Sequence, residues 1–175
     1  MSRYSHSRLN CFQQCPRKFL WRYVWKVSPA TEGVEAFLGK RVHDTLESLY
    51  EDVIRGVPAP ELADLLGRFE RLWDRTWSDS IRIVADQPPE YYRRAGDACL
   101  TTYYKKHYPF DAGTTVGVEK WFEFPIEADS PHTIRGVIDR VDIAPDGAVE
   151  VHDYKTGKRA PTLQALAADQ LSALR

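Results

Sequence analysis

The sequence has few cysteines and no long run of apolar residues. Only three of its 175 residues are cysteines, and this odd, small number does not predict the disulfide framework of a secreted protein. No apolar stretch approaches the about 20 residues that a membrane-spanning helix needs. No secretory signal is visible at the start of the chain. We therefore expect a cytoplasmic protein that has no membrane as a partner.

The sequence also lacks an excess of one charge. The formal net charge is -1 at pH 7, which argues against a uniformly basic coat, so any surface that binds nucleic acid must be local. Internal repeats and low-complexity tracts are absent from the sequence. A chain with 43% hydrophobic and 28% charged residues can bury a core, and its length predicts one domain over residues 1–175.

Two short segments near the C-terminal end carry the residues with the clearest chemistry. Residues 136–142 read Gly-Val-Ile-Asp-Arg-Val-Asp, and residues 152–158 read His-Asp-Tyr-Lys-Thr-Gly-Lys. Between them, Ala-Pro-Asp-Gly at 144–147 is a turn signal, so the two segments are predicted to form a β-hairpin. A three-residue loop over 145–147 would let Gly147 supply the left-handed residue that such loops use.

This register places Asp139 directly opposite Asp153. Side chains alternate along a strand, so both acids and Lys155 would share one face of the hairpin with its valines. Carboxylates that face each other among apolar neighbours repel and lose hydration. A divalent cation between them would remove both objections, and Lys155 could orient a water for attack on a phosphate. The alternative is a surface lattice of salt bridges, which requires the acids to face solvent.

The first 27 residues are locally basic and aromatic, with no acidic residue before Glu32. Basic side chains that follow phosphates, interleaved with rings on which bases stack, are typical of single-strand binding. The alternative is that the rings belong to the core and the basic groups solvate an outer face. The basic residues are Arg3, Arg8, Arg17, Lys18, Arg22 and Lys26, and the aromatic residues are Tyr4, Phe12, Phe19, Trp21, Tyr23 and Trp25.

Hydrophobic periodicity predicts helices in the first two thirds of the chain and strands after them. A broad apolar stripe indicates a helix over 35–55, with Gly39 and His43 along its edge. Taken alone, a single histidine beside an apolar face is more often a core or surface residue than a ligand. The other predicted elements are helices within 60–108, strands at 115–126, 133–143 and 148–155, and a helix at 162–174.

These motifs together resemble the PD-(D/E)XK nuclease superfamily and, within it, the RecB-like branch of helicase–nuclease domains and CRISPR-adaptation nucleases. The resemblance covers residues 3–55 and 115–171. It rests on Gly-x-x-Asp139, on Asp-Tyr-Lys-Thr-Gly at 153–157, and on Gly39-x-x-x-His43. It implies a mixed α/β, restriction-endonuclease-like αβββα(β) core with a helical insertion. The final strand of that core has no counterpart here, which indicates a truncated or minimal relative.

The resemblance also implies boundaries and roles. Residues 1–34 would be a basic and aromatic arm, 35–55 the first-motif helix, 56–110 the helical insertion, and 111–175 the catalytic sheet and the helix after it. The implied catalytic residues are Asp139, Asp153 and Lys155. The implied ligands of one or two Mg²⁺ or Mn²⁺ ions are His43, Asp139, Asp153 and the Tyr154 backbone carbonyl. Glu119 and Gln170 would support the site, and the implied DNA contacts are Arg3, Arg8, Arg17, Lys18, Arg22 and Tyr23.

Cys15 raises the question of an iron–sulfur cluster. In many relatives with this opening, one early cysteine joins three cysteines near the C-terminus to hold a [4Fe–4S] cluster. Cys11 and Cys99 are the only other cysteines here, so four protein thiolates cannot be assembled from this chain. We expect no cluster in this chain and predict that Cys15 is an ordinary buried thiol.

The activity that the resemblance implies is metal-dependent hydrolysis of DNA. The expected substrate is a DNA end or a single strand, cut exonucleolytically in recombination, repair or CRISPR adaptation. DNA would be the main partner, together with a helicase or another repair or adaptation subunit. Two alternatives remain: a catalytically silent DNA-binding module, and a structural subunit of a helicase–nuclease or adaptation complex.

Overall fold

The computed structural model describes residues 2–157, and the chain divides into two compact units. The larger unit comprises residues 29–120 and 137–156, and its described counterpart comprises residues 2–28, 121–136 and 157. The predicted helix at 162–174, with Gln170, lies outside the described residues. Within residues 2–157, no helix is both long and apolar enough to cross a membrane.

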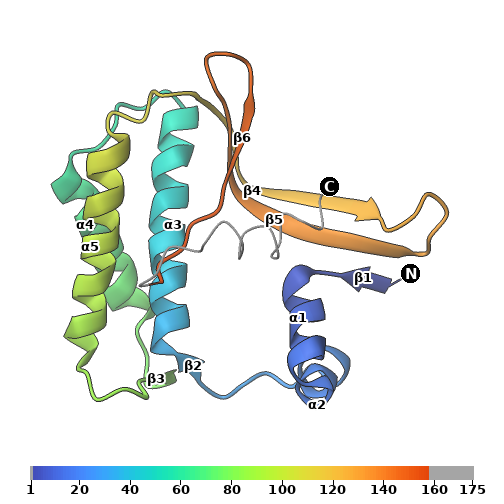
Figure 1. Ribbon diagram of the computed structural model, residues 1–175. Helices are drawn as coiled ribbons and strands as arrows, with labels where there is room; N and C mark the ends of the chain where they lie inside the picture. The colour runs from blue at the N-terminus through green and yellow to red at the C-terminus, as the bar shows by residue number, and fades with distance from the viewer. Residues whose placement is uncertain (1, 158–175) are drawn as a thin grey trace. The chain divides into compact units, whose positions relative to one another are not determined.

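Three helices form the body of the larger unit (Figure 1). They are α3 (Val34–Ile54), α4 (Leu62–Thr76) and α5 (Pro89–His107), and each packs against the other two. Their positions agree with the predicted helix over 35–55 and with the helical pattern of residues 60–108. A proline stands in the first turn of α5, where it loses no helical hydrogen bond.

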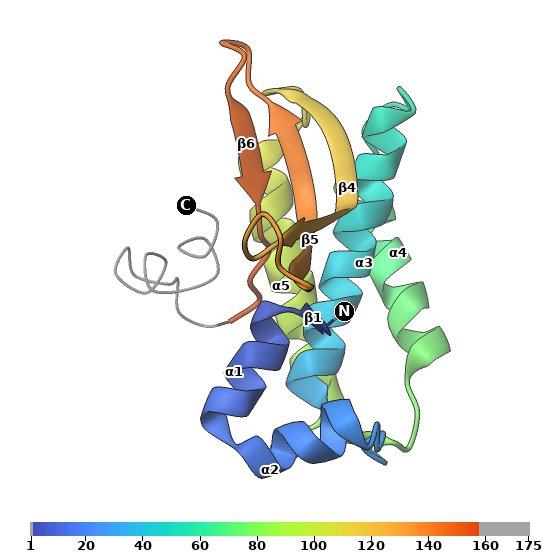
Figure 2. The ribbon, with the colours of Figure 1, turned by 90° about the vertical axis from the view of Figure 1, so that its right-hand side faces the viewer.

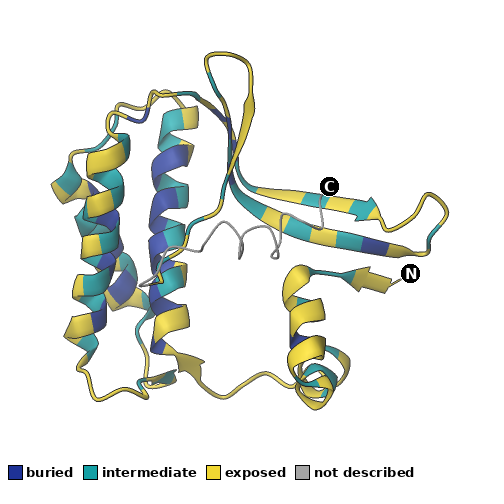
Figure 3. Cartoon of the chain, in the orientation of Figure 1, coloured by how far each residue is buried: buried dark blue, intermediate teal, exposed yellow. Residues whose placement is uncertain are grey.

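The core lies where these helices face one another, with buried positions repeating along one side of α3 (Figure 3). Leu49 on α3 and Phe69 on α4 are fully buried, and so is Leu100 on α5. Gly96 allows the close approach of α5, because a Cβ there would stand 2.3 Å from Phe69 Cζ and 2.9 Å from Leu38 Cδ1. The other buried hydrophobic residues of this cluster are Val34, Phe37, Leu38, Val42, Leu46, Tyr50, Leu65, Trp73, Tyr92 and Phe110.

The sheet has four strands, with β1 (Ser2–Tyr4), β5 (His132–Ile143) and β4 (Thr114–Pro125) in that order and β6 (Val149–His152) also paired to β5 (Figure 2). The strands β4 and β5 continue through both units. A second, two-stranded sheet joins β2 (Glu32–Gly33) to β3 (Ile81–Arg82) in parallel. The mixed α/β class predicted from the sequence is confirmed.

The predicted hairpin register is confirmed. The strands β5 and β6 are antiparallel and pair Arg140 with His152 and Ile143 with Val149. The Ala144 N–H donates to the Ala148 carbonyl at 2.8 Å, and Gly147 has a φ of 86°, which favours glycine because a Cβ would be strained there. The ladder ends at His152, three residues earlier than predicted.

The expectation of a buried valine face on this hairpin is wrong. Val149 and Val151 are 68% and 50% exposed, whereas Arg140 and Asp142 on the other face are only 2% and 7% exposed. The buried face is polar because tyrosines from α3 and α5 supply hydroxyl groups and rings that satisfy the buried guanidinium. Apolar and polar patterning alone assigned the wrong face to the interior.

The smaller unit contains α1 (His6–Gln14), α2 (Pro16–Phe19) and the π-helix η1 (Leu20–Val24). The Ser5 hydroxyl caps α1 by accepting from the Arg8 N–H. Pro16 is the first residue of α2, a position at which proline loses no helical hydrogen bond. The strand β1 extends the sheet by pairing in parallel with residues 132–134 of β5.

Candidate active site

One face of α3 forms the floor of a pocket of about 550 Å³ in the larger unit. Its helical residues recur three or four positions apart, which places them on a single face. The strand residues Glu119 and Asp139 complete the lining. The contributions of α3 are Gly39, Lys40, His43, Asp44 and Glu47.

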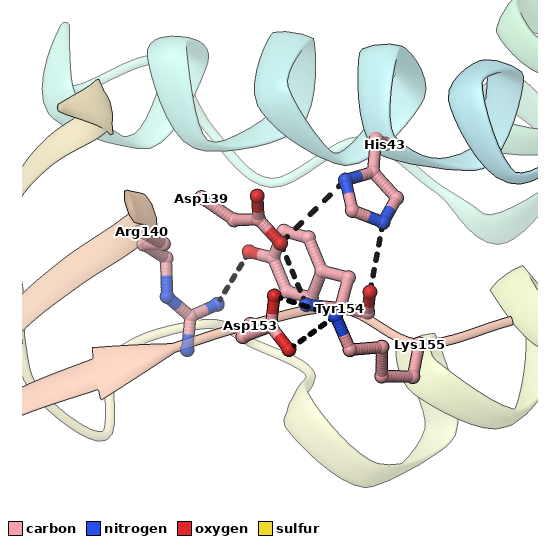
Figure 4. A network of polar contacts seen from close by, with 6 residues as sticks. All are labelled: His43, Asp139, Arg140, Asp153, Tyr154 and Lys155. Atoms are coloured by element: carbon pink, nitrogen blue, oxygen red, sulfur yellow. Dashed lines mark hydrogen bonds and ion pairs between the residues drawn. The ribbon is translucent and has the colours of Figure 1, made fainter. Parts of the chain in front are cut away.

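His43 connects the helix to the hairpin through both of its ring nitrogens (Figure 4). Its Nε2 lies 2.8 Å from the Tyr154 carbonyl oxygen. Because a carbonyl oxygen only accepts, Nε2 carries the hydrogen of this bond. Its Nδ1 lies 3.5 Å from Asp139 Oδ2. The hydrogen bond with Asp139 is the main reason that the pKa of His43 is raised, in spite of partial burial.

Asp139 is held by the chain segment that follows β6. The Tyr154 N–H donates to its Oδ2 at 2.7 Å, and its side chain is only 14% exposed. Burial alone would raise the pKa of Asp139, but the hydrogen bonds from His43 and from the Tyr154 N–H lower it. Asp139 is therefore a carboxylate that stays charged although it is largely buried.

Glu119 reaches the pocket from β4 with an unusual backbone conformation. Its φ is 45°, a left-handed value that is rare for a residue other than glycine and costs about 1–3 kcal/mol. Burial, followed by the negative charge of Asp139, raises the pKa of Glu119. A strained, desolvated acid beside a second acid is a typical feature of a functional site.

His43, Glu119 and Asp139 could together hold a metal ion. One ligand atom from each side chain lies within 4.8 Å of the other two. Two carboxylates and an imidazole, with the Tyr154 carbonyl bonded to that imidazole, form a donor set that suits Mg²⁺ or Mn²⁺. A cation would also relieve the repulsion that raises the pKa of Glu119. The chemistry of these residues fits the metal.

Asp153 and Lys155 lie just beyond the β6 ladder and outside this group of three ligand residues. The Lys155 ammonium contacts the Asp153 carboxylate at 2.7 and 3.0 Å, and both side chains are about half exposed. The ladder stops before them because the Tyr154 N–H donates to the side chain of Asp139 and not to the backbone of β5. The structure thus brings together His43, Asp139 and Tyr154, which the resemblance implies as ligands. It places Glu119, the implied supporting residue, beside them as a potential ligand, and it pairs Asp153 with Lys155.

A second group of potential ligands occupies the opposite face of the hairpin. It consists of Asp142, Glu150 and His152, and its members already pair with one another and with Arg140. His152 Nε2 lies 3.2 Å from Asp142 and 3.6 Å from Glu150, while Arg140 Nε lies 3.1 Å from Asp142. Because the guanidinium already compensates the buried acid, this group is less suited to a cation.

Several predicted DNA contacts take part in the internal packing of the smaller unit. The Arg8 guanidinium lies over the rings of Tyr4, Phe19 and Tyr23, 5.3–5.8 Å from their centroids. Arg3 pairs with Glu123 at 3.2 Å.

The remaining predicted contacts of this unit, Arg17, Lys18 and Arg22, are exposed. The prediction that Cys15 is a buried thiol is wrong. Cys15 is half-buried, and its Sγ caps α2 by accepting from the Lys18 N–H. The buried thiol is Cys11.

Comparison with known proteins identifies the class to which this fold and pocket belong. The model of the PD-(D/E)XK nuclease superfamily matches residues 3–173, so the chain belongs to this superfamily. Its α/β architecture is that of a restriction-endonuclease-like fold. Members are nucleic-acid-binding hydrolases that generally use Mg²⁺ or Mn²⁺. No curated protein matched the chain.

Sequence reasoning missed two parts of this site. It did not single out Lys40 and Asp44 as pocket residues, although their spacing from His43 and Glu47 on one helix face is a readable signal. It also missed Arg140, which strand alternation places on the face opposite Asp139. For the left-handed backbone of Glu119 the sequence offers no signal, because glutamate rarely adopts it.

Proposed function

We propose that this protein is a metal-dependent nuclease that hydrolyses phosphodiester bonds of DNA. The observation that carries the proposal is the convergence of His43, Glu119 and Asp139 on one pocket, with the Tyr154 carbonyl bonded to His43. The match to a nuclease superfamily supports the reaction class. The choice of DNA, and of Mg²⁺ or Mn²⁺, rests on the resemblance of the motifs and on the donor set.

His43, Asp139 and the Tyr154 carbonyl would hold the metal, with Glu119 as a further ligand and Asp153 as the second acid of the motif. The bound ion would polarise the phosphate and lower the pKa of an attacking water. Asp139 is suited to this role because its lowered pKa keeps it ionised near neutral pH. Glu119 lines the same pocket as His43, so the set includes two carboxylates and one imidazole.

Lys155 would position the attacking water and offset charge that develops on the phosphoryl oxygens. Its ammonium has three donors, so it can keep its contact with Asp153 and still donate to a water or a phosphate. The half-exposed position of this pair leaves it accessible to a substrate. Asp153 would in turn fix the direction in which Lys155 points.

The finer assignment is to the RecB-like branch. It is supported by Gly39-x-x-x-His43, by Gly-x-x-Asp139 and by Asp-Tyr-Lys-Thr-Gly at 153–157. The structure adds a reason for the glycine: a Cβ on Gly39 would stand 3.2 Å from the Thr156 hydroxyl of that last motif. This branch implies exonucleolytic cutting of DNA ends or single strands in recombination, repair or CRISPR adaptation.

The same resemblance supplies the remaining assignments. Exposed Arg17, Lys18 and Arg22 would contact the DNA backbone, and Gln170 would support the site. A helicase or another repair or adaptation subunit would be the protein partner, and the cytoplasm the location. The nuclease would be one domain over residues 1–175.

A second candidate is a DNA-binding module without turnover. The observation that favours it is the close pairing of Asp153 with Lys155, in which the two motif residues neutralise each other. In this case the protein would bind single strands in a salt-sensitive manner and cut nothing when metal is supplied. The same cleavage experiment separates it from the proposed nuclease.

The test is cleavage of end-labelled single- and double-stranded DNA with Mn²⁺ or Mg²⁺. We expect cutting that EDTA abolishes and that Asp153→Ala and Lys155→Ala each reduce by at least about 100-fold, since each removes a group acting at the reacting phosphate. Lys105→Ala, which removes an exposed ammonium from α5 of the same unit, is the matched control and should cut normally. DNA binding without cutting would favour the silent module.

A further inference from the structure

Among the residues that the structure describes, Arg140 is the most deeply buried charged residue that the proposed chemistry does not use. It follows Asp139 on β5, so the two side chains point to opposite faces of the strand. Arg140 is 2% exposed, and its guanidinium carbon lies 3.9 Å from the centroid of the Tyr50 ring on α3. An arginine cannot lose its charge in a protein, so its partners must compensate for the lost hydration.

Those partners come from four parts of the larger unit. The guanidinium donates to the hydroxyl of Tyr103 on α5 and, at 3.3 Å, to the hydroxyl of Tyr154. Its Nε lies 3.1 Å from Asp142 Oδ1. Tyr103 and Tyr50 are themselves joined by a hydrogen bond of 2.7 Å between their hydroxyls. Arg140 therefore ties α3, α5 and β5 to the segment after β6.

Tyr154 is the residue through which this network reaches the site (Figure 4). Its N–H donates to Asp139, its carbonyl accepts from His43, and its hydroxyl accepts from Arg140. The β6 ladder has already ended at His152, so ladder hydrogen bonds do not fix Tyr154. Its ring also contacts those of His43 and Tyr103 edge to face, each with 5.6 Å between centroids.

We propose that Arg140 is a positioning residue that fixes Tyr154 from behind, and that Tyr154 in turn fixes the relative placement of His43 and Asp139. The catalytic consequence rests on the proposed nuclease function, whereas the positioning itself does not. A change at the Arg140 guanidinium or at the Tyr154 hydroxyl would loosen the backbone of residue 154 and, through it, the positions of His43 and Asp139. Outer partners of metal ligands commonly change metal affinity by about 10- to 100-fold.

The alternative is that the network only stabilises the fold. In that case, weakening it would lower the melting temperature without a local effect at residue 154. Tyr154→Phe separates the two ideas, because it removes one hydroxyl and keeps the ring and the backbone. Tyr104→Phe is a matched control. It removes a half-buried hydroxyl of α5 that donates to the Pro60 carbonyl at 2.9 Å and takes no part in the Arg140 network.

The experiment measures amide hydrogen exchange at residue 154 in the metal-free full chain by NMR, and then Mn²⁺ affinity by calorimetry. For Tyr154→Phe and for Arg140→Lys we expect exchange at residue 154 to rise about 5-fold, the equivalent of one weakened hydrogen bond, and Mn²⁺ affinity to fall about 10-fold. Tyr104→Phe should change neither quantity. Arg140→Lys keeps the charge but cannot reach both hydroxyls at once.

Unchanged amide exchange at residue 154 in both Tyr154→Phe and Arg140→Lys would overturn the inference, whether or not the Mn²⁺ affinity changes. A rise of equal size in Tyr104→Phe would overturn it as well, because the effect would then be global. If exchange rises as expected but the wild-type chain does not bind Mn²⁺, the positioning role stands and the proposed metal-dependent function fails. The two failures are therefore distinguishable.

Discussion

Replacement of Gly96 by alanine tests the helix packing that holds α3, and with it His43, in place. A Cβ at this position would lie 2.3 Å from Phe69 Cζ and 2.9 Å from Leu38 Cδ1. The first distance is about 1.2 Å shorter than the lower limit of an ordinary carbon–carbon contact of about 3.5 Å. Phe69 is fully buried and Leu38 is 7% exposed, so neither side chain can turn outward to solvent.

The expected result is a net destabilisation of about 1–2 kcal/mol. Overpacking of a core costs about 1–3 kcal/mol, and overlap with two buried side chains places this variant at about 2–3 kcal/mol. The better helix propensity of alanine returns up to about 1 kcal/mol. For a chain of this length, the melting temperature should fall by about 2–8 °C. The measurement is thermal and urea unfolding followed by circular dichroism.

Gly67→Ala on α4 is the matched control, because it makes the same change in another helix of the same unit. The nearest atom to a Cβ there is Arg71 Nη1 at 3.2 Å, the end of a flexible side chain that can move away. This variant should gain roughly 0.5–1 kcal/mol. If Gly96→Ala is as stable as Gly67→Ala, the close packing of α5 against Phe69 and Leu38 does not exist in solution.

Two further predictions concern charge and backbone strain. The hydrogen bond from Arg55 is the main reason that the pKa of Asp52 is lowered; burial opposes it, and a hydrogen bond from Arg68 adds to it. The stability that these bonds supply is present above the unfolded-state pKa of about 3.9 and is lost as the pH falls below it. Urea unfolding of the wild type and Asp52→Asn should differ most near pH 7, and the difference should shrink as the pH falls below about 3.9; a constant difference would contradict this assignment. Glu119→Gly should raise stability by about 1 kcal/mol, because glycine accepts a φ of 45° without strain, and should lower Mn²⁺ affinity at least about 10-fold. Glu119→Gln removes the same desolvated charge but keeps the strained backbone, so it should lose affinity and gain less stability than Glu119→Gly.

The hairpin was predictable from the sequence because its register depends on a short local signal. A turn of three residues with a glycine at the left-handed position fixes which residues pair, and the observed pairs follow that register. The helices were predictable for a similar reason, since their apolar positions repeat with a helical period over 15 residues or more.

The buried face of the hairpin was not predictable, because it depends on partners distant in sequence. Arg140 is buried through contacts with Tyr50 and Tyr103, which lie on separate helices, and the buried Asp142 pairs with Arg140. A pattern of valines on the other face favoured the opposite assignment. The early end of β6 has a related cause: the backbone of Tyr154 bonds to the side chains of Asp139 and His43.

The candidate site was predictable only in its motif residues. Asp139, His43 and the Tyr154 carbonyl converge as the motifs imply. The sequence could not show that Asp153 pairs with Lys155, since that depends on how the chain continues after the strand. In the smaller unit, the rings around Arg8 form an internal cluster, a role that basic and aromatic composition cannot distinguish from nucleic-acid binding.

The most direct test of the central claim is calorimetric titration of Mn²⁺ into the metal-free protein. The account predicts that Asp139→Asn and Glu119→Gln each lower the affinity of the site at least about 10-fold. Glu150→Gln, which removes a charge from the second ligand group on the opposite face of the hairpin, should leave the affinity unchanged. If Glu150→Gln abolishes binding while Asp139→Asn and Glu119→Gln do not, the metal site lies elsewhere and the proposed mechanism is wrong.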